Sequence, residues 1–305
     1  MRVLPPGVSA LAEWPRARLA AGFRAIVSGD GGTPEWVRDL ELGDDEGYFG
    51  PDSAVWVVHG NLATLVGGVR ALLVQALHPA AVTGVDEHST YREDPLGRLA
   101  GTTRWLTVTT FGSRSAADRE CARVRGMHRR VRGTYTDAEG AERGYRAGDE
   151  HLLAWVHGAF TESFLVCHQV FGGPIPGGPN AYVREWATAG ELVGLASPPR
   201  SVAGLEAQMA AFEPELAMTP ATRRTITFLR NPPLPAPALV GYQVLFAAAA
   251  STLDERHQEL LGLPPNAGGT ARAAARAMLA GMRSLLGEGP PAQAAARRRL
   301  DGLTA

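Results

Sequence analysis

The sequence contains no lysine, so the 30 basic residues in this chain of 305 are all arginine. No lysine is therefore available as a Schiff-base nucleophile, a general base or a group facing a metal. The acidic residues number 31, which leaves a net charge of −1. This balance argues against a general attraction to nucleic acid or to an anionic membrane, so neither is expected as a partner.

Cysteine is almost as scarce as lysine. The sequence has two, Cys121 and Cys167, and both fall in apolar helical patterns. Two thiols do not make a disulfide framework, so they are interpreted as reduced, buried residues of a cytoplasmic protein. The N-terminal residues lack an uninterrupted apolar core followed by a cleavage site, so a secretory signal is not expected.

Long uninterrupted apolar runs are missing as well. The longest apolar stretch, 53–77, is broken by His59, Asn61, Arg70 and Gln75. A membrane-spanning helix needs about 20 predominantly apolar residues with few or no charges. The stretch is therefore predicted to be a buried core helix, and no integral membrane span is expected.

Several catalytic motifs are absent too. The sequence has no Gly-x-Gly-x-x-Gly, no phosphate-binding Gly-x-x-x-x-Gly-Lys and no Gly-x-Ser-x-Gly, which argues against the usual dinucleotide, P-loop and hydrolase sites. It also lacks His-Glu-x-x-His, Cys-x-x-Cys and Glu-x-x-His, which argues against common zinc sites and a ferritin-like di-iron centre. Without Cys-x-x-Cys-His, haem cannot be attached covalently in the usual c-type way.

What the sequence does contain is helical periodicity, and segments that alternate with period two are nearly absent. We therefore predict an all-α protein with a single large helical domain. Asp94 followed by Pro95 is an expected helix start, as is Ser113 or Ser115, and 134–148 is expected to form a loop or a weak hairpin. A short piece is expected over 79–85. The predicted helices are 53–77, 94–111, 113–133, 149–171, 180–194, 201–212, 219–229, 236–262, 268–286 and 291–302.

The same pattern predicts three parts along the chain. Residues 1–50 are expected to form an N-terminal helical extension packed on the core, 51–265 the helical core itself, and 266–305 the C-terminal helices. The Pro/Gly-rich stretches 172–179 and 231–237 are short enough to be loops within one domain.

Histidine is the residue type that stands in unexpected places. In the helix that includes 115–132, His128 lies on an apolar stripe, so its side chain is expected to face the interior. A buried imidazole left without a partner costs about 1–3 kcal/mol, so it needs a hydrogen bond or a metal. Its spacing alone leaves both roles open, a core histidine bonded to a carbonyl or a metal ligand. The stripe consists of Ala117, Cys121, Val124, His128 and Val131.

The neighbouring helices carry further candidates. One stripe of the preceding helix combines Arg98, Thr102, Trp105 and Thr109, and it could line a polar pocket, bind a carboxylate or face solvent. In the helix that starts at 149, a second stripe predicts buried histidines. His78 is expected to be structural, at a helix end, and His151 and His257 are expected to be exposed. The second stripe consists of His157, Thr161, Phe164 and His168.

Eight short motifs lie between residues 45 and 265. Together they resemble the oxygenase family of the bacterial latex-clearing proteins (rubber oxygenases) and the fungal membrane-bound oxygenase of mycophenolic acid biosynthesis. The motifs are Trp56-x-Val58-His59, Gly67-Gly68-x-Arg70-Ala71-Leu72-Leu73, Gln75-Ala76-Leu77-His78-Pro79, Asp94-Pro95-x-Gly97-Arg98-Leu99-x-x-Thr102, Thr109-Thr110-Phe111-Gly112, Met127-His128-x-x-Val131-x-Gly133, Tyr145-Arg146-Ala147 and Trp155-Val156-His157.

The resemblance implies a globin-like helical core that binds haem b without a covalent bond. It implies His128 as the proximal iron ligand, with Arg98 and Thr102 on the distal side to anchor or polarise O₂ or a substrate carboxylate. Trp105 and His157 are candidates to line the pocket or bind a propionate. Gly101 stands where rubber oxygenases can carry a distal lysine, so rubber cleavage is not carried over with the fold.

The resemblance also implies an oxidoreductase, an oxygenase or oxidase that acts on O₂ and an apolar small molecule. Two alternatives stay open. One is a protein that binds haem or a small ligand without turnover. The other is a non-haem metal oxygenase on the same scaffold, in which two or three of His59, His78, His128 and His157 hold the metal.

Overall fold

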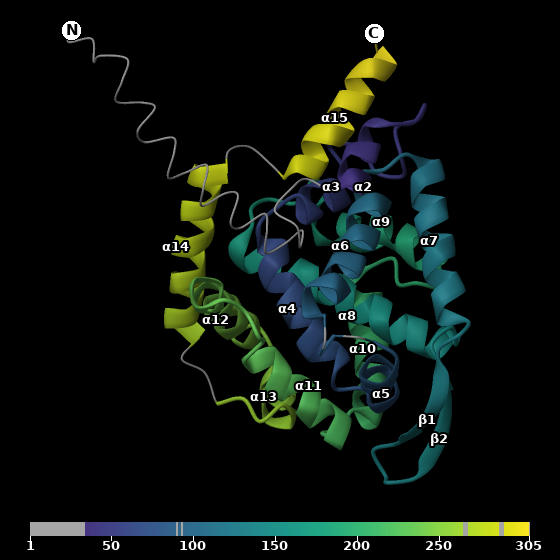
Figure 1. Cartoon of the computed structure of the whole chain (residues 1–305), viewed down its shortest axis with the longest axis vertical. Coiled ribbons are helices and arrows are strands. Elements are labelled where there is room, and N and C mark those ends of the chain that lie inside the picture. The colour runs from purple at the N-terminus through teal and green to yellow at the C-terminus, as the bar shows by residue number, and fades with distance from the viewer. Residues whose placement is uncertain (1–33, 90, 93, 265–267, 287–289, 305) are drawn as a thin grey trace, which may run out of the picture.

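The computed structural model describes residues 34–304 except 90, 93, 265–267 and 287–289; the helices expected before residue 34 lie outside this range. The described part contains fourteen α-helices and one two-stranded sheet, which confirms the all-α class (Figure 1). The elements are α2 (Glu35–Arg38), η1 (Asp39–Glu41), α3 (Ala54–His59), α4 (Ala63–Gln75), α5 (Pro79–His88), α6 (Pro95–Phe111), α7 (Arg114–His128), β1 (Arg132–Thr136), β2 (Glu142–Arg146), α8 (Glu150–Phe171), α9 (Gly178–Val193), α10 (Val202–Phe212), η2 (Glu213–Glu215), α11 (Pro220–Arg230), α12 (Ala236–Ala250), α13 (Glu255–Leu260), α14 (Gly268–Leu286) and α15 (Pro291–Thr304).

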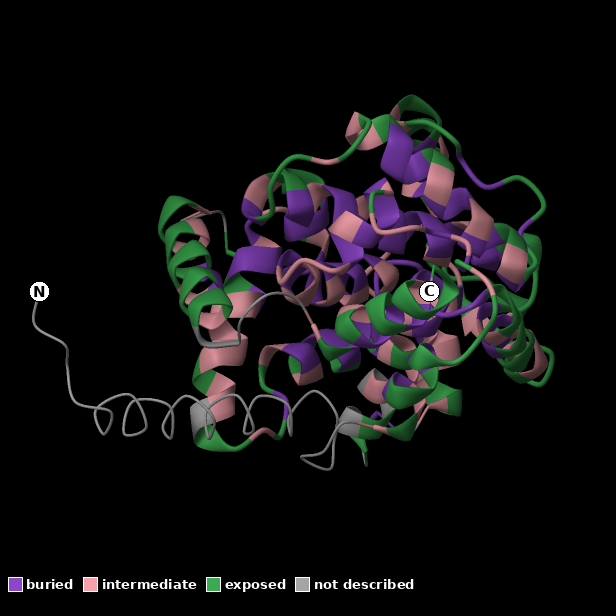
Figure 2. Cartoon of the chain, turned by 90° about the horizontal axis from the view of Figure 1, so that it is seen from above, coloured by how far each residue is buried: buried purple, intermediate pink, exposed green. Residues whose placement is uncertain are grey.

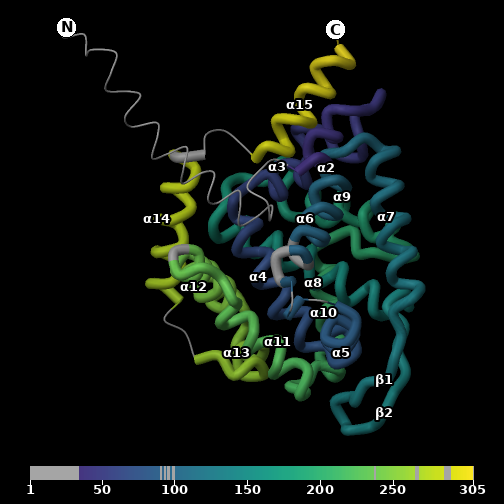
Figure 3. The backbone as a smooth tube through the Cα atoms, in the orientation of Figure 1, coloured from purple at the N-terminus to yellow at the C-terminus, as the bar shows by residue number. Residues whose placement is uncertain are grey.

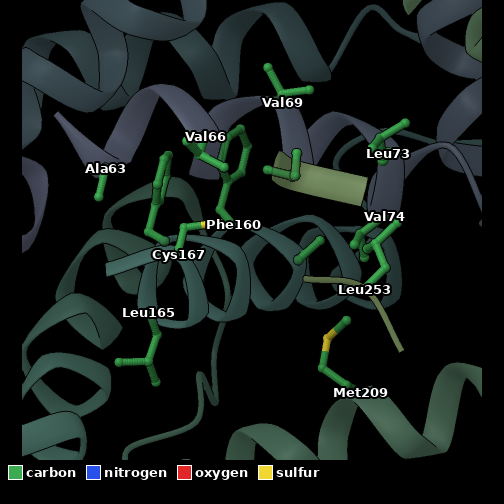
Figure 4. Packing of buried hydrophobic residues seen from close by; sticks show 14 of the residues in the cluster. Ala63, Val66, Val69, Leu73, Val74, Phe160, Leu165, Cys167, Met209 and Leu253 are labelled. Atoms are coloured by element: carbon green, nitrogen blue, oxygen red, sulfur yellow. The ribbon is translucent and has the colours of Figure 1, made fainter. Parts of the chain in front are cut away.

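The core forms where α4 packs along α8, with α9, α10 and α12 around this pair. Apolar side chains of α4 and α8 fill the space between the two helices (Figure 4). Gly67 lets them approach closely, because a Cβ atom built there would lie 2.7 Å from the ring and 3.3 Å from the Cα atom of Phe164. Figure 2 shows the buried residues gathered in the middle of the helical body and the exposed residues around its rim.

The single helix predicted over 53–77 is wrong in one respect, because it is two helices. Ser53 caps α3, its side chain accepting from the Trp56 N–H at 3.2 Å. The chain then breaks after His59. The side-chain oxygen of Asn61 accepts from the Ala63 N–H at 2.9 Å, so it starts α4 by a local bond that competes with a continuous helix.

The chain turns sharply between α4 and α5. Residues 76–78 lie outside both helices, and Pro79 is the first residue of α5, a position where its missing N–H is not needed. No single described helix has both the length and the apolar composition of a membrane span; α4 and α5 meet that test only as a pair bent by 106°.

The prediction that the helix through His128 continues to Gly133 is also wrong. The helix α7 ends at His128, and Arg132 already begins β1. The antiparallel hairpin of β1 and β2 pairs Gly133 with Tyr145, and the buried Tyr145 ring packs against Ala80 and Leu152. The packing of Tyr145 keeps the chain after His128 extended. Helical periodicity in the local sequence cannot reveal such a contact, because the contact is made by a residue of the other strand.

Other boundaries follow local capping. Asp94 caps α6, accepting from the Gly97 N–H at 2.9 Å, and Ser113 caps α7, as predicted. The predicted helix 236–262 is wrong because it is divided into α12 and α13. Asp254 caps the second of these, accepting from the His257 N–H at 2.7 Å.

The described end of the N-terminal part packs against the last helix. Val37 and Leu40 share a small apolar cluster with Trp56 of α3 and with alanines of α15. Arg299 of α15 is buried there and donates to the Leu40 carbonyl at 2.7 Å and the Asp45 carbonyl at 3.2 Å. The division into 1–50, 51–265 and 266–305 stays a prediction.

Two neighbouring glycines of α4 test the packing of α4 on α8. In protein prepared without any bound ligand, Gly67→Ala is expected to lower the free energy of unfolding by about 1–3 kcal/mol, because the added methyl overlaps Phe164. Gly68→Ala is the matched control, because its Cβ would meet no described atom within 4 Å. It should stabilise by about 0.5–1 kcal/mol through helix propensity. Urea unfolding measures both, and equal changes would contradict this packing.

Candidate functional site

The helices α6 and α7 form a tight helical hairpin, joined through Gly112 and Ser113. Arg104 of α6 pairs with Glu120 of α7 at 3.2 Å. Because the two helices run in opposite directions (Figure 3), the first turn of α6 lies level with the last turn of α7. The backbone at Arg98 and the end of α7 that carries His128 therefore both lie at the open end of the hairpin, opposite its turn.

His128 is the last residue of α7 and is half-buried. The earlier members of its stripe are buried, as predicted, with Ala117 and Cys121 at 0 % exposure and Val124 at 9 %. The Cβ atom of His128 lies near Gly148, just before α8. The imidazole thus sits where α7, the hairpin of β1 and β2, and the start of α8 meet.

The other α6 candidates lie on a half-buried face. Thr102 and Trp105 are both half-buried, and Thr109 of the same stripe is fully buried. Trp105 packs on a cluster of α7 and α9 residues that includes Cys121 and Val124, which places it one to two turns of α7 from His128. The side chain of Arg98 lies outside the described part of the structure.

His157 lies on α8 and is buried at 5 % exposure. Its Nε2 edge faces Gly190 of α9, where an added Cβ would lie 3.2 Å from that nitrogen. Burial lowers the pKa of His157 to about 4, so the ring is neutral at physiological pH. His157 thus occupies the α8–α9 interface.

His59 and His168, both buried, serve the core. The Nδ1 of His59 lies 2.8 Å from the Thr110 hydroxyl, and its Nε2 lies 3.0 Å from the Tyr182 hydroxyl. Burial, with a smaller contribution from His168, lowers the pKa of His59 to about 3. With both ring nitrogens hydrogen-bonded, the geometry of His59 is that of a satisfied core histidine.

A second histidine cluster lies at the opposite end of α8 from the His59 network. Nε2 of His78 and Nε2 of His151 lie 3.2 and 2.8 Å from the same carboxylate oxygen of Glu215. His78 is buried and His151 exposed. Burial lowers the pKa of His78, and the Glu215 carboxylate opposes that shift.

Sequence reasoning missed this cluster. His151 was expected to be uninformative, and Glu215 had no local signal because 64 residues separate the two. His257, expected to be exposed, is 4 % exposed and sits between Asp254 and Glu213; that prediction is wrong because both carboxylates satisfy the buried ring.

Cavities open beside two of these groups of residues. One, about 430 Å³, lies between η1 and the α6–α7 hairpin and is lined by arginines, among them Arg104 and Arg123. The other, about 200 Å³, adjoins His78 and Glu215 under the β hairpin. Thr102, Trp105, His128 and His157 line neither of them.

Comparison of the sequence with models of known protein families shows which family the chain belongs to. The family model described as "ER-bound oxygenase mpaB/B'/Rubber oxygenase, catalytic domain" matches residues 56–284. The chain belongs to this family. The match begins within α3 and ends within α14, so it takes in both histidine clusters and the α6–α7 hairpin. No curated protein and no solved structure matches the chain.

Family membership confirms the resemblance drawn from the motifs. The chain carries an oxygenase catalytic domain and is an oxidoreductase. Such chemistry implies O₂, a small-molecule substrate and a metal or haem cofactor, because O₂ reacts with organic molecules slowly without one.

The neutral, buried His157 predicts a pH dependence of stability. Its pKa is about 4 folded against 6.5 unfolded, so the unfolded chain binds more protons and stability falls as pH drops from 6.5 toward 4. In His157→Leu, the loss of unfolding free energy between pH 6.5 and 4 should be smaller than in the wild type by on the order of 3 kcal/mol. Urea unfolding at several pH values measures it. His88→Leu, at an exposed histidine, is the control, and an unchanged slope in His157→Leu would refute the assignment.

Proposed function

We propose that this protein is a haem b-dependent oxygenase or oxidase of apolar small molecules, with His128 as the proximal iron ligand. The observation that carries the proposal is the α6–α7 hairpin. Its open end carries both the start of α6, with Arg98 and Thr102, and the end of α7, where a half-buried histidine follows buried apolar residues of the same stripe. In an oxygenase family, such a histidine is a natural ligand for haem iron.

Two helical glycines, one on α4 and one on α6, support a ligand bound against helix backbones. Gly68 of α4 and Gly101 of α6 are half-buried, and a Cβ built at either would meet no described atom within 4 Å. Glycine inside a helix costs about 0.5–1 kcal/mol relative to alanine, and close packing against described protein atoms does not account for these two. A porphyrin plane lying against the backbone accounts for them, so the residues present fit haem.

Partly exposed apolar side chains also support an apolar ligand. Leu65 and Leu72 of α4, Leu106 of α6 and Val156 of α8 are only partly buried, although they adjoin the main core. Partly exposed apolar side chains on neighbouring helices are what a hydrophobic cofactor or substrate would cover. The proposed substrate is accordingly an apolar small molecule.

Histidine-ligated haem supplies O₂ binding and activation. The chain's own residues then divide the remaining work. Arg98 would supply a cation to anchor or polarise O₂ or a substrate carboxylate, and Thr102, one turn away, would supply a hydroxyl donor. Trp105 forms the wall between α6 and α7. His157 is the proposed partner of a haem propionate; in this structure its Nε2 edge packs on Gly190.

Haem binding is tested by absorption. The purified protein, reconstituted with haem if needed, should show a Soret band. His128→Ala should lose that band and keep its far-UV circular dichroism, because the residue ends a helix without being part of the core. His88→Ala is the matched histidine control and should keep the band. If the wild-type protein shows no Soret band after reconstitution with haem, the proposal is wrong.

Turnover separates an enzyme from a haem carrier. With a reductant and a candidate polyene, the wild type should consume O₂. Thr102→Val, which keeps the shape and removes the hydroxyl, should lower this rate by at least about tenfold with the Soret band intact, whereas Thr102→Ser should keep most of it. Equal rates in both variants would remove Thr102 from the catalytic role, and a haem-loaded wild type that consumes no O₂ would favour the carrier.

A further inference from the structure

We infer that His78, His151 and Glu215 form a second metal site, one that takes a divalent first-row transition metal through two imidazoles and one carboxylate. One ligand atom from each of the three residues lies within 4.8 Å of the other two. The inference does not depend on haem at His128.

The contacts between these side chains resemble a coordination sphere. The Nε2 atoms of His78 and His151 both converge on Oε2 of Glu215, at 3.2 and 2.8 Å. Ligand atoms bound to one Zn²⁺ at about 2.0–2.2 Å are separated by about 3–3.5 Å along the edges of a tetrahedron. Small side-chain rotations therefore suffice to seat an ion between the three ligands.

The surroundings hold the two rings in place. The His151 ring centroid lies 4.6 Å from that of Phe212, and the His78 centroid lies 5.7 Å from that of Trp155. The three ligands come from separate elements, since His78 precedes α5, His151 lies in the first turn of α8 and Glu215 ends η2. A metal here would tie these elements together.

One side of the cluster is open. His78 and Glu215 line the cavity of about 200 Å³ beneath the β hairpin, together with Tyr135, Asp137 and Arg143. With three protein ligands and a cavity at the remaining side, the site keeps a coordination position for water or another small ligand.

The ligand set selects the class of ion. Two imidazoles and one carboxylate suit Zn²⁺, Fe²⁺ or Co²⁺, whereas Mg²⁺ and Ca²⁺ prefer sites made of oxygen atoms. No cysteine lies in the cluster, so a soft thiolate site is not formed.

Cobalt titration of the full-length, untagged, metal-stripped protein tests the inference by calorimetry and by the visible absorption of Co²⁺. The wild type should bind one Co²⁺ at this site, and Zn²⁺ but not Mg²⁺ should displace it. His151→Ala and Glu215→Gln should each weaken binding by more than about a hundredfold, beyond what the loss of a supporting residue costs. Both changes lie at partly or largely exposed side chains, so either variant can report if the other folds poorly.

His88→Ala, at an exposed histidine outside the cluster, is the control and should bind Co²⁺ as the wild type does. Wild-type protein that binds no Co²⁺, or unchanged affinity in both cluster variants, would overturn the inference. Loss of Co²⁺ in His128→Ala but not in His151→Ala would overturn it as well, because the ion would then sit in the proposed haem pocket. The Soret band of haem-loaded His151→Ala should match the wild type, so the two proposals can fail separately.

Discussion

The close approach of α4 to α8 at Gly67 is the constraint on which the rest of the molecule depends. With no side chain at that point, the Phe164 ring lies directly against the α4 backbone. The pair forms the centre around which α9, α10 and α12 pack. Interiors packed to crystal-like density transmit small displacements, so a shift at this contact would be felt at both His59, just before α4, and His78, just after it.

The histidines illustrate how one residue type takes different roles in a chain without lysine. His59 and His157 are buried and neutral, held by hydroxyls or packed on backbone. His257 is buried between carboxylates, which raise its pKa against the effect of burial. His78 is buried beside one carboxylate and one further imidazole. Burial alone therefore does not identify a functional histidine; the number and type of groups that face its ring nitrogens do.

The features that could be predicted from the sequence are those fixed by interactions between residues close together in the chain. Caps such as Asp94 and Ser113 were predictable because the bond that ends or starts a helix is made within a turn. The end of α7 was not, because Tyr145 sets it from the far strand of a hairpin. Among site residues, spacing placed His128 on the buried stripe of α7, where it is half-buried rather than fully interior. The His151–Glu215 pair joins residues far apart in sequence and leaves no periodic signal.

The short connection between α6 and α7 has a consequence for how the protein acquires its structure. Because the two helices are neighbours along the chain, their contacts close only short loops and cost little conformational entropy. Helical hairpins of this kind have low contact order, and low contact order favours fast folding. The element that carries Arg98, Thr102 and His128 is therefore expected to form before the long-range packing of α12, α14 and α15, so an early folding intermediate would already hold these residues on one unit.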